Sequence, residues 1–592
     1  MHDSTRCGAA IALAAFLSFA PGDSMSDETG WQTLAESTDY ARTARYAETM
    51  EWARRLADAS DQIDYQVFGQ SPEGRDLVVL VASSDRAFTP AAARATGKEI
   101  VLVQAGIHPG EIEGKDAGLA LLRDIAITGE HAALLEHAIV MFIPIFSVDG
   151  HERFHPYTRI NQNGPEKSGW RATAQNYNLN RDYIKADSPE MRAWLALFNA
   201  WLPDLFIDTH NTNGADYQYD FTYGLEMYAN AHPALVAWQR DAFYGAIFPA
   251  LEARGHKLSP YIVLRDGTDP TLGFEVFQSE PRYSTGYTAI QNRPALLVEM
   301  HMLKDYRTRV VGTYAILLES LRYLNAHPGT LRRAVDAADA ATETRYRDGG
   351  EYPLALAIGE GSRPFEFLGY EFTRTDSEVS GGTWIQYDPD RPRTFTVPIY
   401  DEVTVRHAAP TPSAYIIPAA LTDVIERLDW HGIEYRRLDA PRDIEVKTWL
   451  FRSVEWAARP FENRHMVEDF NAVPIERNMH FPAGSVMVSL DQRRANVIMH
   501  MLEPHAPDSL LRWGLLDHIF ESKEHAEPRV LERIAREMMA EDPALREAFE
   551  RRVADDPEFA ANPRARLHWF YQRTPYYDER LNVYPIGRLM EE

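Results

Sequence analysis

The stretch "EIVLVQAGIHPGEIEG", residues 99–114, decides the fold. Its first half contains an unbroken apolar run, Ile100–Val103, which is typical of a strand that is buried on both faces of a sheet. A Pro-Gly pair then provides a tight turn, so His108 and Glu111 lie three residues apart and face the same way. A buried strand that leads directly into an imidazole and a carboxylate predicts an α/β sheet with a ligand site at its edge.

The first 330 residues repeat this pattern of short apolar runs and amphipathic stretches. We expect strands over 78–82, 99–103, 138–145, 204–208 and 295–299, and helices over 115–127, 189–201, 233–254 and 309–325. Continuous apolar strands that alternate with helices predict an α/β fold with a mixed, mostly parallel central sheet flanked by helices.

The composition changes after residue 330. Residues 351–420 are rich in Thr, Tyr, Val and Phe with Gly and Pro between them, which indicates antiparallel strands. Residues 508–555 follow charged helical patterns. A chain of 592 residues also exceeds what one hydrophobic core usually serves. We therefore expect an α/β domain over 25–330 and a C-terminal α+β domain over 331–592, β-rich and then helical, whose function the sequence does not indicate.

The N-terminus contains an apolar run from Gly8 to Ala20. This run is too short to span a bilayer but has the length of a signal-peptide core. Ser18 and Ala20 provide small residues at the positions that a signal peptidase reads. We expect a signal peptide over residues 1–24 and an exported protein, periplasmic or extracellular. Translation from Met25 would instead produce a cytoplasmic protein.

The charge and the cysteine content exclude several classes of function. The formal net charge is -26, which argues against a nucleic-acid partner and against adhesion to an anionic membrane surface. We expect no stable membrane span, and the sequence does not indicate an oligomeric state. The single cysteine, Cys7, lies before the apolar N-terminal run. Cleavage of the expected signal peptide would remove this cysteine. Any metal in the mature chain must then be held by His, Asp or Glu.

Polar side chains follow several of the expected strands. His108 and Glu111 follow one strand, His210 ends the strand in "LFIDTH", and Glu299 ends the strand in "PALLVE". Asp149 also follows a strand, but its Asp-Gly sequence is more typical of a turn. Two histidines and one glutamate, with water in the fourth position, are the ligands of a catalytic zinc ion. Glu299 would then be the base that takes the proton of that water.

The order of several motifs carries a family resemblance. The motifs are "GQSPEGRDL" (69–77), "GIHPGEIEG" (106–114), "SVDGHERF" (147–154), "GWR" (169–171), "NLNRD" (178–182), "DTHN" (208–211) and "LLVEMH" (296–301). Together, over about residues 40–325, they resemble the zinc carboxypeptidases of the carboxypeptidase A family. The resemblance implies the fold expected above, one Zn²⁺ per chain, and hydrolysis of the last peptide bond of a peptide that has a free C-terminal carboxylate.

The resemblance also implies a role for each matching residue. Three residues match the zinc ligands: His108, Glu111 and His210. Glu299 matches the general base, and Arg171 matches the arginine that polarises the scissile carbonyl and stabilises the oxyanion. Asn180 and Arg181 match the pair that holds the terminal carboxylate of the peptide, for which the planar fork of Arg is well suited.

The chain departs from the family pattern at three points. Asn178 stands where better-known members have an acidic residue that orients a zinc-bound imidazole, and an amide oxygen would do so with less charge. Gly110 stands where those members have a substrate-binding arginine. The mobile tyrosine that donates a proton has two candidates, Tyr283 and Tyr287.

Two other functions remain open on the sequence. Related amidases and deacylases keep such a zinc site but act on small N-acyl or cell-wall substrates, and the presence of Asn180 and Arg181 favours a carboxypeptidase over them. A non-catalytic peptide-binding relative would not need the base Glu299.

Overall fold

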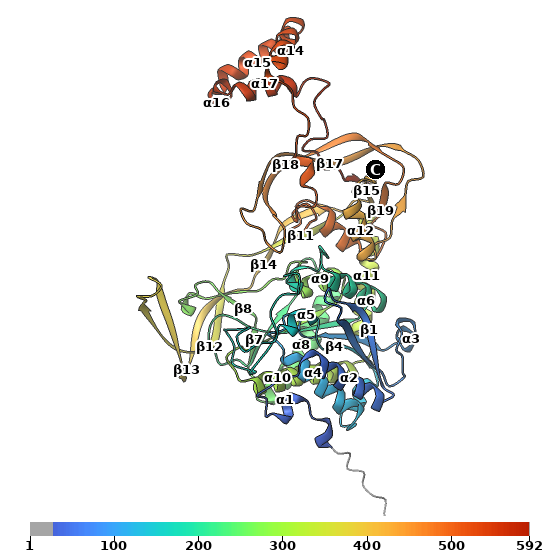
Figure 1. Ribbon diagram of the computed structural model, residues 1–592, viewed down its shortest axis with the longest axis vertical. Coiled ribbons are helices and arrows are strands. Elements are labelled where there is room, and N and C mark those ends of the chain that lie inside the picture. The colour runs from blue at the N-terminus through green and yellow to red at the C-terminus, as the bar shows by residue number, and fades with distance from the viewer. Residues whose placement is uncertain (1–27, 591–592) are drawn as a thin grey trace, which may run out of the picture.

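The computed structural model describes residues 28–590 (Figure 1). The signal peptide expected over 1–24 and the alternative start at Met25 lie outside this range. Within it, none of the helices combines the length and the apolar character needed to cross a bilayer.

A mixed eight-stranded sheet forms the centre of the first unit, in the order β1-β2-β4-β3-β5-β10-β6-β7. The strands are β1 Ile63–Gln70, β2 Asp76–Ala82, β3 Glu99–Gln104, β4 Ala138–Ile143, β5 Leu205–Asn211, β6 Phe221–Leu225, β7 Leu258–Pro260 and β10 Ala295–Met300. The four inner strands β4, β3, β5 and β10 run parallel, and antiparallel strands flank them. The predicted fold class, a mostly parallel α/β sheet, is confirmed.

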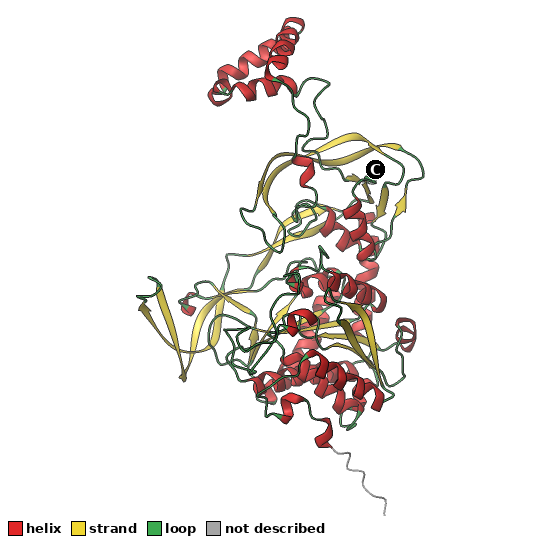
Figure 2. Ribbon diagram, in the orientation of Figure 1, coloured by secondary structure: helices red, strands yellow, loops and turns green. Residues whose placement is uncertain are grey.

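Helices cover both faces of this sheet (Figure 2). They include α2 Tyr46–Ala59, α4 Glu113–Ala126, α6 Pro189–Trp201, α8 Tyr244–Ala253, α9 Ser284–Ile290, α10 Tyr306–Ala326 and α11 Thr330–Thr344. Alternate residues of β3 point to opposite faces, as the geometry of a strand requires. Ile100 and Leu102 pack in one core with α6, and Val101 and Val103 pack in another with α4 and α10. The burial of both faces explains why this strand has no polar alternation.

The rest of the chain is β-rich and then helical, as predicted. A six-stranded sheet has the order β16-β19-β15-β20-β17-β18, and helices α12 Thr422–Trp430 and α13 Ala495–Leu502 accompany it. Its strands are β15 Ala414–Ile417, β16 Arg436–Arg437, β17 Arg442–Trp456, β18 Val467–Phe481, β19 Val486–Ser489 and β20 Gly587–Leu589. Four helices form a bundle at the far end of the molecule: α14 Pro528–Glu541, α15 Pro543–Asp555, α16 Pro557–Ala561 and α17 Pro563–Tyr571 (Figure 1).

Strands from the two parts of the chain join each other. β11 Glu351–Ile358 pairs with β14 Val403–Pro410, while β12 Arg363–Asp376 and β13 Thr383–Tyr400 form a long hairpin. β13 also pairs with β9 Phe274–Val276, which pairs in turn with β8 Ile262–Leu264. One hydrophobic cluster contains Trp194 and Tyr287 as well as Leu428 and Ile498. The C-terminal unit, which we define as residues 351–590, is therefore packed onto the first unit through shared sheet and shared core.

Candidate metal and active site

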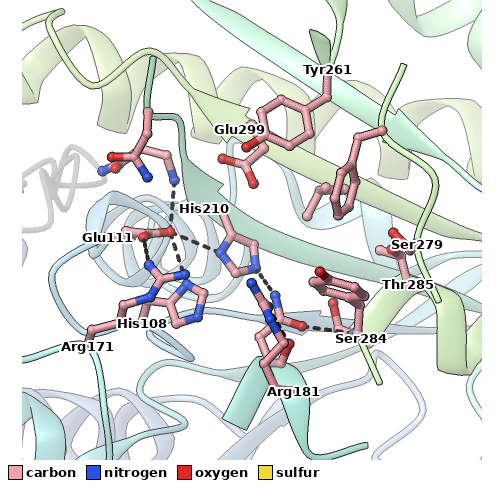
Figure 3. A pocket seen from close by; sticks show the side chains of 16 residues that line it. His108, Glu111, Arg171, Arg181, His210, Tyr261, Ser279, Ser284, Thr285 and Glu299 are labelled. Atoms are coloured by element: carbon pink, nitrogen blue, oxygen red, sulfur yellow. Dashed lines mark hydrogen bonds and ion pairs between the residues drawn. The ribbon is translucent and has the colours of Figure 1, made fainter. Parts of the chain in front are cut away.

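A pocket of about 100 Å³ lies at the carboxyl edge of the central sheet (Figure 3). Its wall contains the seven residues that the sequence singles out: His108, Glu111, Arg171, Asn180, Arg181, His210 and Glu299. They come from separate segments: the turn after β3, the loop that carries Arg171, the 3-10 turn Leu179–Arg181, the end of β5 and the end of β10. The parallel strands bring them to one edge of the sheet, where ligands of such sheets bind.

Two histidines and a glutamate converge on one point of this pocket. The Oε2 atom of Glu111 lies 3.3 Å from Nδ1 of His108 and 3.0 Å from Nδ1 of His210. All three side chains are buried, and their potential ligand atoms lie within 4.8 Å of one another. This set of two imidazole nitrogens and one carboxylate oxygen fits a zinc ion that keeps one open coordination position.

The remaining nitrogen of each imidazole is held by a neighbouring oxygen. Nε2 of His108 donates to Oδ1 of Asn178 at 2.9 Å, and Nε2 of His210 donates to Oδ2 of Asp208 at 2.9 Å. These bonds direct both Nδ1 atoms at Glu111, as outer partners of metal-binding histidines commonly do. The amide at position 178 thus occupies the orienting position expected from the sequence.

The two imidazoles differ in their electrostatic surroundings. Burial lowers the pKa of His108 to about 3, so its ring is neutral and free to act as a ligand. Burial also opposes a charge on His210, but Asp208 and Glu111 outweigh this effect and raise its pKa well above the usual value. A divalent cation between His210 and Glu111 would take the place of that proton, since metal ligands bind in their deprotonated form.

Glu299 lies beside one of these ligands, His210. It is the register partner of His210 in the parallel pair β5/β10, so the two side chains lie side by side. Burial raises the pKa of Glu299 to about 8, and its Oε2 has no hydrogen-bond partner within residues 28–590. A carboxylate with a free oxygen and a pKa near neutrality suits a general base.

The opposite end of the pocket carries a free positive charge. The Arg181 guanidinium packs over the ring of Tyr283 at 4.2 Å, and its Nη1 donates to the carbonyl oxygen of Asn180 at 2.6 Å. The Oδ1 atom of Asn180 accepts a hydrogen bond from the Ser284 amide at 2.9 Å, which leaves the amide group turned toward the pocket. Arg181 forms no ion pair within the part of the chain that the structure describes. Its charge is therefore available to an anionic ligand.

Comparison with known proteins identifies the domain. Residues 49–227 match the family described as zinc carboxypeptidase. The chain carries a zinc carboxypeptidase domain. The matched range contains six of the seven residues above, and Glu299 follows it.

Relatives extend the similarity beyond this domain. Carboxypeptidase 2 of Trichophyton rubrum is 26% identical over 491 residues, which cover 79% of this chain and 84% of that protein. Carboxypeptidase 2 of Trichophyton tonsurans is 24% identical over 488 residues, with 79% and 84% covered. The alignments are longer than the first 330 residues, so they include part of the C-terminal unit. The family and these relatives indicate a metallocarboxypeptidase, a hydrolase.

Solved structures resemble the chain over about half of its length. The metallo-carboxypeptidase of Pseudomonas aeruginosa, in complex with (2-guanidinoethylmercapto)succinic acid, is 20% identical with a TM-score of 0.34, and 48% of this chain and 69% of that chain are covered. The metallo-carboxypeptidase of Burkholderia cenocepacia is 17% identical with a TM-score of 0.35, with 48% and 68% covered.

Sequence reasoning missed two residues of the zinc carboxypeptidase domain that lie at its site. The first is Arg159, whose guanidinium lies 2.8 Å from Oε1 of Glu111, the oxygen that Arg171 also contacts at 2.7 Å. A Cβ atom on Gly110 would lie 3.2 Å from Cδ of Arg159. The glycine at 110 therefore leaves room for this loop arginine, and that glycine is the signal that could have indicated it.

The second missed residue is Tyr261, between β7 and β8. It lines the pocket, and its hydroxyl faces Glu299 (Figure 3). The charge of Glu299, together with burial, raises the pKa of Tyr261 well above its usual value, so the phenol keeps its proton. No motif marks this position, because the loop that carries Tyr261 has no family pattern in the sequence.

The two tyrosines considered from the sequence occupy different places. Tyr283 lines the pocket beside Arg181. Tyr287 is fully buried, and its hydroxyl is hydrogen-bonded to Nδ1 of His431 at 2.7 Å. Asp149 lies in the short helix α5 Val148–Glu152, so the turn expected from its sequence is wrong; Ser71 and Arg75 hold its carboxylate, and it lies outside the pocket wall.

Proposed function

We propose that the chain is a zinc metallocarboxypeptidase that hydrolyses the C-terminal peptide bond of peptides. One observation supports this most strongly: a free guanidinium, Arg181, and a free carboxylate oxygen, on Glu299, face the same pocket on either side of the His-Glu-His set. A peptide whose terminal carboxylate pairs with Arg181 would have its last peptide bond near the base. This arrangement favours an exopeptidase substrate, since an internal peptide segment has no main-chain carboxylate next to the bond that is cleaved.

Each pocket residue has a separate role in binding and hydrolysing the peptide. Arg181 forms a two-pronged bond with the terminal carboxylate, and the Asn180 amide donates to one of its oxygens. Arg171, whose side chain is partly exposed at the pocket mouth, donates to the scissile carbonyl oxygen as negative charge develops on it. Glu299 takes a proton from the attacking water and passes it to the leaving amine.

The metal supplies the remaining chemistry. His108, Glu111 and His210 would hold one Zn²⁺, which when bound lowers the pKa of water and polarises the carbonyl. Asn178 and Asp208 fix the two imidazoles from behind, so the ligand set is in place before the ion binds.

The test compares the wild type with Glu299→Gln on paired peptides, each made with a free and with an amidated C-terminus. We expect the wild type to bind about one zinc and to release single residues from the free-carboxylate peptides only. Glu299→Gln keeps the zinc and loses turnover by about 10²- to 10⁴-fold, the usual contribution of a general base.

Three other results would each contradict the proposal. Cleavage of amidated peptides at the same rate would remove the role of Arg181 and favour an amidase. Zinc with no release of residues would favour a deacylase of small substrates. No zinc in either protein would leave a peptide-binding relative.

A further inference from the structure

The C-terminal unit reaches the backbone of Asn178, next to the pocket, through a short hairpin, residues 461–464. The backbone groups of Phe461 and Arg464 bond to each other in both directions, at 2.8 and 3.1 Å, and the two central residues, Glu462 and Asn463, have positive φ values of 48° and 67°. The turn points Glu462 at the catalytic unit. Its Oε2 atom accepts a hydrogen bond from the backbone amide of Asn178 at 3.1 Å.

That contact lies at the start of the carboxylate-binding segment, residues 178–181. Oδ1 of Asn178 accepts from the amide of Asn180 at 3.1 Å as well as from His108. Asn180 and Arg181 follow directly in the same 3-10 turn. Glu462 thus holds the backbone from which the proposed carboxylate-binding side chains extend.

The hairpin is fixed to the catalytic unit by a forked ion pair. Nε and Nη2 of Arg464 contact the two oxygens of Asp187 at 2.6 and 2.7 Å. Arg427, also from the C-terminal unit, contacts the same carboxylate at 2.5 Å. Phe461 stacks on Trp513, with ring centroids 6.1 Å apart. A bidentate arginine pair is geometrically specific, so the tip has one defined position over the segment.

A second anchor holds the neighbouring wall of the pocket, which packs against segment 178–181. The buried carboxylate of Asp508 accepts a hydrogen bond from the Arg282 amide at 2.7 Å and forms an ion pair with Nε of Arg282 at 2.8 Å. The next two residues are Tyr283, on which Arg181 packs, and Ser284, whose amide bonds to Asn180. Asp508 therefore sets the position of the loop that closes the pocket on this side.

We propose that the C-terminal unit is a positioning element of the peptide-carboxylate pocket, with Glu462 fixing segment 178–181 and Asp508 fixing segment 282–284. This inference rests on the proposed function, because it assigns the pocket to a terminal carboxylate. Neither residue contacts the substrate or lines the pocket; each acts through the backbone that carries a residue that does. The two units are thus needed together for peptide binding, although the residues of the proposed reaction all belong to the first.

The size of the effect follows from the hydrogen bond that each substitution removes. One lost hydrogen bond to a charged group costs about tenfold or more in an equilibrium. Because Glu462 and Asp508 hold the residues that bind the terminal carboxylate, their loss is expected in KM and Kd rather than in kcat.

The experiment uses the full chain with zinc and four variants. Glu462→Ala removes the acceptor for the Asn178 amide, and Glu462→Gln keeps an acceptor oxygen. Asp508→Asn keeps the shape but loses the charge facing Arg282. Glu468→Ala is the matched control, since Glu468 is an exposed carboxylate of the same unit. Melting temperature and zinc content are recorded for each, so a folding defect is recognised.

We expect Glu462→Ala to raise KM for free-carboxylate peptides about tenfold, with kcat within about twofold of the wild type. Asp508→Asn raises KM in the same direction, while Glu462→Gln and Glu468→Ala stay within about twofold. Hydrogen exchange adds a readout that needs no turnover: peptides covering 174–184 exchange faster in Glu462→Ala and unchanged in Glu462→Gln.

An unchanged KM in Glu462→Ala and Asp508→Asn, in folded and zinc-loaded protein, would overturn the inference. So would a fall in kcat that follows the melting temperature across all variants. The peptide Kd, measured by calorimetry in a Glu299→Gln background, distinguishes failure of the positioning inference from failure of the proposed function. A wild type that releases no residue contradicts the proposed function, whereas a tenfold weaker Kd in Glu462→Ala still supports the positioning role.

Discussion

Nε2 of His108 donates a hydrogen bond to the amide oxygen of Asn178 at 2.9 Å. A neutral acceptor at this point makes the imidazole less basic than a carboxylate would, and outer partners of metal-binding histidines typically change metal affinity by about 10- to 100-fold. We expect Asn178→Asp to bind zinc about tenfold more tightly, as measured by competition with a chromophoric chelator.

A control for this substitution lies two residues away. Asn176 is exposed and also tolerates the same change, because its φ of 63° is a conformation that both Asn and Asp adopt. Asn176→Asp adds the same charge without reaching His108, and its zinc affinity should equal that of the wild type. Equal affinities for both variants would show that the Asn178 contact does not tune the metal site.

The free guanidinium of Arg181 should determine the preference for a terminal carboxylate. Arg181→Met keeps much of the packing on Tyr283 and removes the charge, so KM for free-carboxylate peptides should rise about 50-fold, as expected for a lost charge-assisted bond. The rates on amidated and free peptides should then become similar. Arg153→Met is the control, since Arg153 is an exposed cation that does not line the pocket. A strong preference for the free carboxylate in Arg181→Met would contradict this assignment.

Tyr261 and Tyr283 both line the pocket, and their hydroxyl groups can be distinguished by experiment. The Tyr261 hydroxyl faces Glu299, so Tyr261→Phe should lower kcat by about tenfold, as for loss of one hydrogen bond that forms in the transition state, with zinc content unchanged. Tyr283→Phe keeps the ring that Arg181 packs on and should leave kcat within about twofold. The opposite ranking of the two variants would identify Tyr283 as the functional phenol.

Stability should depend on pH through Glu190, which does not line the pocket. This side chain is fully buried in the first turn of α6, and neither of its oxygens has a hydrogen-bond partner within the described chain. Burial raises its pKa from 4.5 to about 7. The folded state therefore keeps a proton that the unfolded state releases. Stability from this group is complete below about pH 4.5 and is lost as the pH rises through 7.

Glu190→Gln removes this titration and tests it. We expect the variant to be less sensitive to pH between 5 and 8 and to be more stable than the wild type at pH 8, by up to about 3 kcal/mol. Urea unfolding at pH 5 and pH 8 measures the difference, and Glu136→Gln, at an exposed position, is the control. Parallel stability curves for wild type and Glu190→Gln would contradict a raised pKa.

The parts of the site that follow local rules could be predicted from the sequence. A continuous apolar run indicates a strand that is buried on both faces. The residues at the carboxyl ends of parallel strands lie at one edge of the sheet, so the sequence predicted that His108, His210 and Glu299 lie close together. Arg159 and Tyr261 could not be predicted in the same way. Both residues lie in irregular loops, for which the sequence has no periodic signal, and Arg159 also depends on the space left by Gly110.

The relation between the two units was also beyond local patterns. β13 pairs with β9, so residues on either side of the change in composition form one sheet. The hairpin that carries Glu462 reaches Asn178 through a tertiary contact between distant parts of the chain. A hydrophobic pattern indicates which side chains are buried but not which distant segment buries them. The sequence therefore predicted only that the second unit is β-rich and then helical, and not its contacts with the first unit.

The four-helix bundle α14–α17 leaves and rejoins the β-rich unit at one place. The amide of Asn582 donates to the carbonyl of Ile519 at 2.9 Å, so the chain is already joined across the base of the bundle. The bundle has its own core, formed by Ala535, Phe549, Phe559, Trp569 and Phe570. The bundle is therefore an insertion between Ile519 and Asn582, two residues that are hydrogen-bonded to each other. We call this inserted segment the cassette. A short linker could replace the cassette, or another domain could be grafted there, without cutting any strand of the fold that supports the pocket.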